Sequence, residues 1–258
     1  MLKKFKPDLK IGKKVVILLS VIVLFSLIGF IEAKQDGREV TSVHVNINFE
    51  DDNFFVTDQD IMHLITLNGS DKIVGEKFED IDLKTLEMRI KNNKFVSDAQ
   101  VYKDHKGTLM IEVKQCRPIA RVIQSDAPHA YIGSRGNTLG TSDKFTARVI
   151  LIDGPGSSNL LSENFLTSDE GSSYLALLNH IDQDKFWKAQ LSEMYIDSRG
   201  ELRFYPQVGN QVIYFGKPDD VENKLKRLKI FYKEILPSKG WNKYKSVNLK
   251  FRNQIICE

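Results

Sequence analysis

The stretch TLMIEVKQCRPIA, residues 108–120, separates two different sequence patterns. Leu109, Ile111 and Val113 alternate with more polar or longer side chains, which is the period of two expected of a half-buried strand. Pro118 ends this alternation, and beyond it short apolar runs are separated by turn sequences rich in Gly, Asn and Ser. We therefore expect a domain junction within this stretch.

The residues before the junction predict the order strand, helix, helix, strand, strand. Thr57, with an acidic Asp60 three residues later, is typical of a capped helix start, and Asp82 is a predicted N-cap of the second helix. Together these elements make a compact α+β unit of about 75 residues, enough for a small independent domain. The predicted elements are a strand over 42–49, a helix from 57, a helix over 82–91, and strands over 99–103 and 109–114.

The residues after the junction predict a second, mainly β domain. A long helix over 218–236 starts with Pro218 and carries its acidic residues early and its basic residues late, which complements the helix dipole. The segment Lys245–Arg252 alternates and is predicted to be the terminal strand, with Val247, Leu249 and Phe251 facing inward. The other predicted elements are strands over 119–123, 131–132, 149–152, 194–196, 202–205 and 212–215 and a helix over 173–181.

An uncharged apolar run, VVILLSVIVLFSLIGFI at residues 15–31, precedes both domains. As a helix it covers about 25 Å, slightly less than the hydrocarbon core of a bilayer, and flanking lysines can snorkel to cover the difference. The alternative is a cleaved signal peptide, whose apolar region is typically shorter and ends in a small-x-small site, whereas Ile31-Glu32-Ala33 is a poor site. We expect an uncleaved transmembrane anchor.

The positive charge of the chain is concentrated at its start. The formal net charge is +3, but residues 1–14 hold six lysines and one aspartate, a net +5, so the rest of the chain carries −2. A basic nucleic-acid-binding surface is therefore not indicated. Because short basic flanks stay in the cytoplasm, everything after Ile31 is expected on the far side of the cytoplasmic membrane.

Sequence motifs of catalysis and metal binding are absent. No H-E-x-x-H, C-x-x-C, G-x-S-x-G, S-x-x-K or phosphate-cradling Gly-Lys-Ser/Thr sequence occurs, so we expect no enzyme, no cofactor and no small-molecule substrate. Glu50-Asp51-Asp52 could hold Ca²⁺, but a solvated turn is the simpler interpretation. The two cysteines, Cys116 and Cys257, are expected to be unpaired because nothing in the sequence brings them together.

Two features favour protein binding instead. A terminal strand at a sheet edge offers unpaired backbone N–H and C=O groups to a strand of a partner. The basic face of the helix over 218–236 could meet an acidic partner or an anionic membrane, although a solvated helix face is the more ordinary interpretation.

Several of these segments, taken in order after a single span, resemble the FtsQ/DivIB family of bacterial cell-division proteins. The resemblance covers nearly the whole chain. Gln115 and Cys116 depart from it by replacing the acid and the base of the family's E-R-x-P-V-A junction. The segments that carry the resemblance are FVSDAQV at 95–101, TLMIEV at 108–113, QCRPIA at 115–120, the strand over 212–216, Lys224-Leu225 with Leu228, and the closing segment 244–256.

The resemblance implies a non-enzymatic divisome scaffold whose last strand docks an FtsB-like partner, itself paired with FtsL. It also implies a POTRA domain that helps to recruit upstream factors such as FtsK. Two rivals are a POTRA-type component of protein export or outer-membrane assembly and a membrane-anchored exported hydrolase, which would need His129 or His180 beside a Ser and an acid. The residues carried over as the docking strand are Tyr244, Lys245, Val247, Leu249 and Phe251.

The expected fold class is therefore α+β: an N-terminal transmembrane helix, a small βααββ POTRA-like domain, and a mainly antiparallel β domain with a C-terminal helix and a terminal edge strand. The expected boundaries are a cytoplasmic tail over 1–14, the span over 15–31, a linker over 32–40, the POTRA-like domain over 41–115 and the β domain over 116–258.

Overall fold

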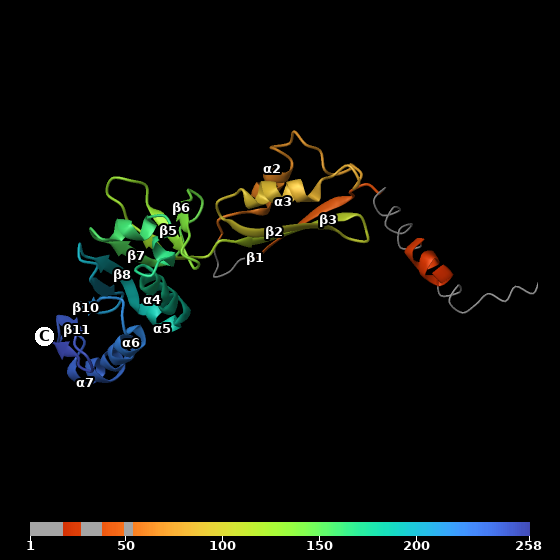
Figure 1. Cartoon of the computed structure of the whole chain (residues 1–258). Coiled ribbons are helices and arrows are strands. Elements are labelled where there is room, and N and C mark those ends of the chain that lie inside the picture. The colour runs from red at the N-terminus through yellow and green to blue at the C-terminus, as the bar shows by residue number, and fades with distance from the viewer. Residues whose placement is uncertain (1–17, 27–37, 49–53) are drawn as a thin grey trace, which may run out of the picture. The chain divides into compact units, whose positions relative to one another are not determined.

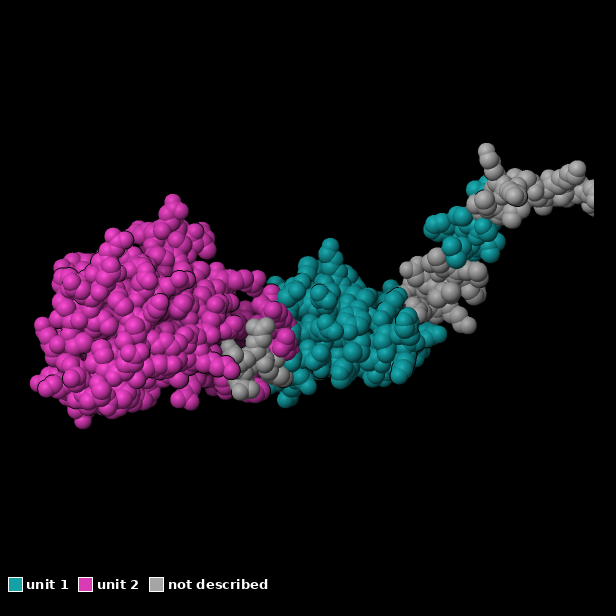
Figure 2. Space-filling view, turned by 90° about the horizontal axis from the view of Figure 1, so that it is seen from below, with its two compact units in different colours: residues 1–47, 57–92, 98–113 teal, residues 48–56, 93–97, 114–258 magenta. Residues whose placement is uncertain are grey.

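The computed structural model describes residues 18–26, 38–48 and 54–258 (Figure 1). Contacts within the chain divide it into two compact units, which are coloured separately in Figure 2. The first comprises 1–47, 57–92 and 98–113, and the second comprises 48–56, 93–97 and 114–258. The second unit thus includes two short segments that precede the predicted junction.

The predicted membrane segment over 15–31 lies partly outside the described residues. Within it, residues 18–26 are helical and exposed. Among the helices that the structure describes, none combines the length and the apolar character needed to cross a bilayer.

The first unit has the predicted order of elements. Its three-stranded sheet has the order β1 (Ser42–Asn48), β3 (Thr108–Gln115), β2 (Val96–Lys103), with helices α2 (Asp58–Ile65) and α3 (Leu83–Lys91) between β1 and β2 in the chain. The caps are confirmed. Thr57 and Asp60 form a reciprocal capping box, and the Asp82 carboxylate accepts hydrogen bonds from the backbone N–H groups of Lys84 and Thr85.

The second unit is built on a nine-stranded sheet with the order β12-β11-β10-β9-β8-β7-β4-β5-β6. Five of its eight neighbouring pairs are antiparallel and three are parallel. The strands are β4 (Pro118–Val122), β5 (Ala130–Gly133), β6 (Thr138–Gly140), β7 (Ile150–Asp153), β8 (Leu191–Ile196), β9 (Leu202–Pro206), β10 (Val212–Gly216), β11 (Ser246–Asn248) and β12 (Ile256–Cys257).

Helical connections explain two of the parallel pairs, because parallel neighbours need a crossover. Two helices, α4 (Ser172–Gln183) and α5 (Lys185–Gln190), connect β7 to β8, after two short 3₁₀ turns over Ser157–Leu161 and Phe165–Thr167. A second crossover connects β10 to β11 and consists of α6 (Val221–Ile230), a π-helical turn (η4, Phe231–Ile235) and α7 (Leu236–Lys239).

Three predictions for this unit were wrong in detail. The long helix begins at Val221 after Asp220, whose φ is +47°, so Pro218 precedes the helix instead of starting it. The predicted strand over 245–252 is ordered as a strand only over Ser246–Asn248. It is also not the edge strand, because β12 pairs with its outer side.

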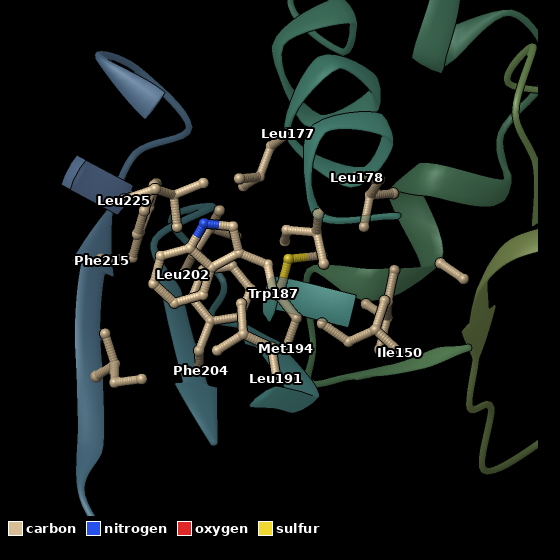
Figure 3. Close-up of a cluster of buried hydrophobic side chains, with 14 of the residues drawn as sticks. Ile150, Leu177, Leu178, Trp187, Leu191, Met194, Leu202, Phe204, Phe215 and Leu225 are labelled. Carbon is tan, nitrogen blue, oxygen red and sulfur yellow. The ribbon is translucent and has the colours of Figure 1, made fainter. Parts of the chain in front are cut away.

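One continuous hydrophobic core lies between the helices and the sheet of the second unit (Figure 3). Trp187 of α5 is buried among Met194, Leu202 and Phe204 of the strands and Leu177 of α4. Its ring also packs edge-on against Phe186 and Tyr232. Trp187 therefore joins both crossovers to the sheet.

A second aromatic cluster involves the two early segments of this unit. Phe55 stacks on Phe95 with ring centroids 4.8 Å apart and meets Tyr131 and Phe145 edge-on. The buried Gln115 amide oxygen accepts hydrogen bonds from the backbone N–H groups of Phe55 and Val56, both at 3.0 Å. Gln115 is thus a neutral acceptor that satisfies two backbone donors.

The two tryptophans of the chain give a direct test of this core. We expect Trp187→Ala to destabilise the second unit by about 3–5 kcal/mol, because it leaves a cavity among fully buried neighbours. Thermal unfolding followed by circular dichroism should show a fall in Tm of at least about 6 °C. The control is Trp241→Ala, since Trp241 is 42% exposed and should cost much less. Equal losses for the two variants would contradict this description of the core.

Candidate partner-binding surface

The C-terminal hairpin of β11 and β12 forms one end of the nine-stranded sheet. Val247 and Leu249 are completely buried and belong to the core. On one side β11 runs parallel to β10, and the Leu249 N–H donates to the Tyr214 carbonyl at 2.9 Å. On the other side β12 runs antiparallel to it. The interior position of β11 means that its backbone is not free to bind a partner strand.

The free backbone groups at this end belong to β12. Ser246 and Glu258 exchange both backbone hydrogen bonds, at 2.9 and 3.2 Å. The next pair of the antiparallel ladder, Val247 and Cys257, is therefore a non-hydrogen-bonded pair, and the Cys257 N–H and C=O point away from β11. No strand lies beyond β12 in the described part of the chain. The sheet edge, predicted at the segment that forms β11, thus lies at Cys257 of β12.

The five predicted docking residues divide into two groups. Val247 and Leu249 face the core, as predicted. Tyr244 is partly buried, with its ring centroid 6.0 Å from that of Phe231, and the Lys245 side chain is exposed. Phe251 was predicted to face inward but is 49% exposed, because the strand has ended and a turn with Asn253 at φ +60° reverses the chain.

Arg227 of α6 holds this turn in place. Its guanidinium donates to the backbone carbonyls of Phe251 (2.7 Å), Leu249 (3.3 Å) and Gln254. A planar guanidinium has several donors in a fixed arrangement, so one side chain can satisfy several acceptors of a turn. The sequence alone does not reveal this role, because it depends on the packing of α6 against a distant segment.

A charged surface groove of about 640 Å³ lies beside this turn. Its lining includes the basic residues Lys217, Lys224, Arg227, Lys250 and Arg252, together with three acids and the ring of Phe251.

Most of these charges are satisfied within the groove. The buried Lys224 ammonium donates to the Asp219 carboxylate and to the Lys217 carbonyl, and this hydrogen bond holds the pKa of Asp219 below its ordinary value. Lys250 donates to Glu201 and likewise lowers the pKa of that carboxyl group. Arg252 is exposed and has no hydrogen bond or ion pair with another described residue. It is the cation of the groove that is available to a partner.

Exposed apolar side chains gather in the same part of the sequence. Four of the seven large exposed apolar side chains described in the second unit come from its last 30 residues, namely Ile230, Trp241, Phe251 and Ile256. These four side chains are near one another in the sequence, and each is accessible to a partner.

Metal-binding groups are not brought together in the part of the chain that the structure describes. No group of three or more His, Cys, Asp or Glu residues could hold a metal ion there. The groove beside the turn and a second cavity of about 420 Å³ near Asn137 and Asn164 contain no histidine. The His129 imidazole accepts a hydrogen bond from the Gln124 N–H at 3.2 Å, a local turn contact. Both cysteines are free thiols, and burial raises the pKa of each.

Two family models match the chain. A family model described as FtsQ/DivIB, C-terminal related, matches residues 117–258, and one described as a POTRA-like domain matches residues 38–114. The chain therefore belongs to the FtsQ/DivIB family, whose members are non-catalytic scaffolds, and membership implies a role in cell division. A search of curated proteins found no match.

The Arg227 contact predicts how firmly the hairpin is held. Arg227→Ala should raise hydrogen exchange in 246–258, because three carbonyls lose their donor, and Arg227→Lys should not restore protection, because a single ammonium lacks the planar array of donors. Exchange measured by mass spectrometry on the full chain checks this. The control is Lys226→Ala, an exposed neighbour on α6. Unchanged exchange in Arg227→Ala would contradict the assigned role.

Proposed function

We propose that this chain is a non-enzymatic scaffold of the bacterial divisome, held by a single span in the cytoplasmic membrane, that docks partner proteins through its extracytoplasmic domains. The observation that carries the proposal is the open backbone edge at Cys257, which lies in a part of the chain rich in exposed apolar side chains and close in sequence to the unpaired Arg252. Such a surface can bind protein without any catalytic group.

The proposed topology places the basic tail over 1–14 in the cytoplasm, the anchor over 15–31 in the membrane and a linker over 32–40 on its far side. A POTRA domain over 41–115 and a β domain over 116–258 then lie in the periplasm or the extracytoplasmic space. The described part of the anchor supports this, because Leu18, Ile22 and Phe25 belong to a helical run of exposed apolar side chains. Lipid is the environment that would cover such side chains.

The proposed docking mode is strand addition to β12. A partner strand would pair with the outward N–H and C=O of Cys257, and its side chains would contact Tyr244, Lys245 and Phe251. Val247 and Leu249 are buried in the core and would hold the β11–β12 hairpin in position. An acidic residue of the partner would pair with Arg252.

The proposed partner is an FtsB-like protein paired with an FtsL-like protein through a coiled coil. For the POTRA domain we propose recruitment by an upstream factor of the FtsK kind, which rests on the family relationship alone.

A proline at Cys257 tests the docking mode. It removes an outward donor without removing a bond of the β11–β12 ladder, and the preceding residue is already extended, as a proline requires. We expect Cys257→Pro to bind an FtsB-like partner at least about tenfold more weakly, because it loses a main-chain hydrogen bond and its ring obstructs the approaching strand. The measurement is the affinity of the full chain for the extracytoplasmic segment of that partner.

The matched control is Cys257→Ala, which also loses the thiol but keeps the N–H and should bind like the unchanged chain. In cells depleted of the natural protein, Cys257→Ala should support division and Cys257→Pro should leave filaments. Full binding by a folded Cys257→Pro chain would refute strand addition at this edge.

A further inference from the structure

In the part of the chain that the structure describes, the face of the nine-stranded sheet opposite the helices is partly exposed over β7 to β10. Met194, Ile196 and Phe204 point toward the helices and are buried, and Figure 1 shows α4, α5 and α6 on one side of the sheet. The alternating residues point the other way. Leu151 is 40% exposed, and Glu193, Tyr195, Arg203, Tyr205 and Tyr214 are partly exposed.

Arg203 lies at the centre of this face. Its guanidinium carbon is 5.7 Å from the ring centroid of Tyr195 and 5.5 Å from that of Tyr214, which occupy the neighbouring positions on β8 and β10. Such cation–π contacts hold the guanidinium between the two rings. Arg203 makes no hydrogen bond or ion pair with another described residue, so its N–H donors remain available.

The register of β8 and β9 places an acid at the opposite corner of the same patch. Glu193 pairs with Tyr205, and Tyr195 pairs with Arg203. These four residues therefore form a quadrilateral, with Arg203 and Glu193 on one diagonal and the two tyrosines on the other. The two residues of each diagonal are about 7–8 Å apart. Glu193 has no ion pair with Arg203 or with any other described residue.

Two other charged residues in these rows contact groups outside the Arg203–Glu193 patch. Arg121 has its guanidinium carbon 5.6 Å from the centroid of the buried Tyr131 ring. The Asp153 carboxylate accepts a hydrogen bond from the Gly154 N–H at 2.6 Å. Arg203 and Glu193 are thus two charges of opposite sign on this face that make no hydrogen bond or ion pair with another described residue.

We propose that this face binds the same face of a second copy of the chain. The two-fold axis would lie parallel to the sheet, between the two copies, along the Tyr195–Tyr205 diagonal. Rotation about it places Arg203 of each copy over Glu193 of the other. Each tyrosine then lies over the same tyrosine of the other copy. A symmetric dimer interface must be complementary to itself, and a patch with both charges on one diagonal and two aromatic rings on the other satisfies that condition. Tyr and Arg are also the residues enriched at the energetic centres of interfaces.

A β-strand of a partner is not the expected occupant, because strands β7 to β10 are each hydrogen-bonded on both sides and offer no free backbone groups on this face. The inference does not depend on the proposed docking function, which uses the edge at Cys257.

Charge reversal tests the pairing with the chain itself as the probe. The full chain in detergent should sediment as a dimer. Arg203→Glu and Glu193→Arg should each weaken self-association by at least about tenfold, because like charges then face each other twice. A mixture of the two single variants should associate, since each interface then contains two opposite-charge pairs, and the double variant should associate for the same reason.

Two controls separate this interface from others. Lys226→Glu reverses an exposed charge on α6 and should leave dimerisation unchanged, and so should Cys257→Pro, which affects only the β12 edge. Circular dichroism confirms that each variant is folded. Any of three results would overturn the proposal: the unchanged chain is monomeric, the single variants associate normally, or the mixture of the two does not associate. Loss of the dimer in Cys257→Pro would assign self-association to the sheet edge instead.

Discussion

The parallel pairing of β11 with β10 determines the architecture of the C-terminal end. A chain that leaves β10 can return parallel to it only through a crossover, so α6 and α7 must cross the sheet. That crossing buries Leu225, Leu228 and Leu236 in the common core. It also delivers β11 to the interior of the sheet, and the last residues then reverse to form β12. The open edge at β12 is therefore a consequence of how α6 and α7 pack across the sheet.

Most of the charged groups at this end are engaged within the chain. Lys224 and Lys250 are paired with acids, and Arg227 is occupied by backbone carbonyls. What remains available is a backbone edge at Cys257, the exposed ring of Phe251 and the cation of Arg252. A partner recognised by main-chain pairing, one aromatic contact and one charge needs no reactive group, in agreement with the scaffold character of the FtsQ/DivIB family.

The sequence predicted local features well and long-range pairing poorly. The βααββ order and the caps at Thr57 and Asp82 follow from periodicity and from hydrogen bonds between near neighbours. The alternation of 245–252 predicted a single strand, but periodicity does not reveal that β11 pairs on both sides or that Asn253 turns the chain. A strand of two residues, such as β12, is too short to show a period. The Arg203–Tyr214 contact depends on strand register, which a single sequence does not encode locally.

Hydrogen exchange at the backbone of Cys257 measures most directly whether a partner strand extends the sheet at β12. Hydrogen exchange of this amide, resolved by fragmentation of the C-terminal peptide of the full chain, should be fast in the free protein and at least about tenfold slower with an FtsB-like segment bound. Protection is expected there because the N–H becomes a donor in a new ladder. Unchanged exchange of the Cys257 amide in the saturated complex, with protection confined to other residues, would contradict strand addition at β12.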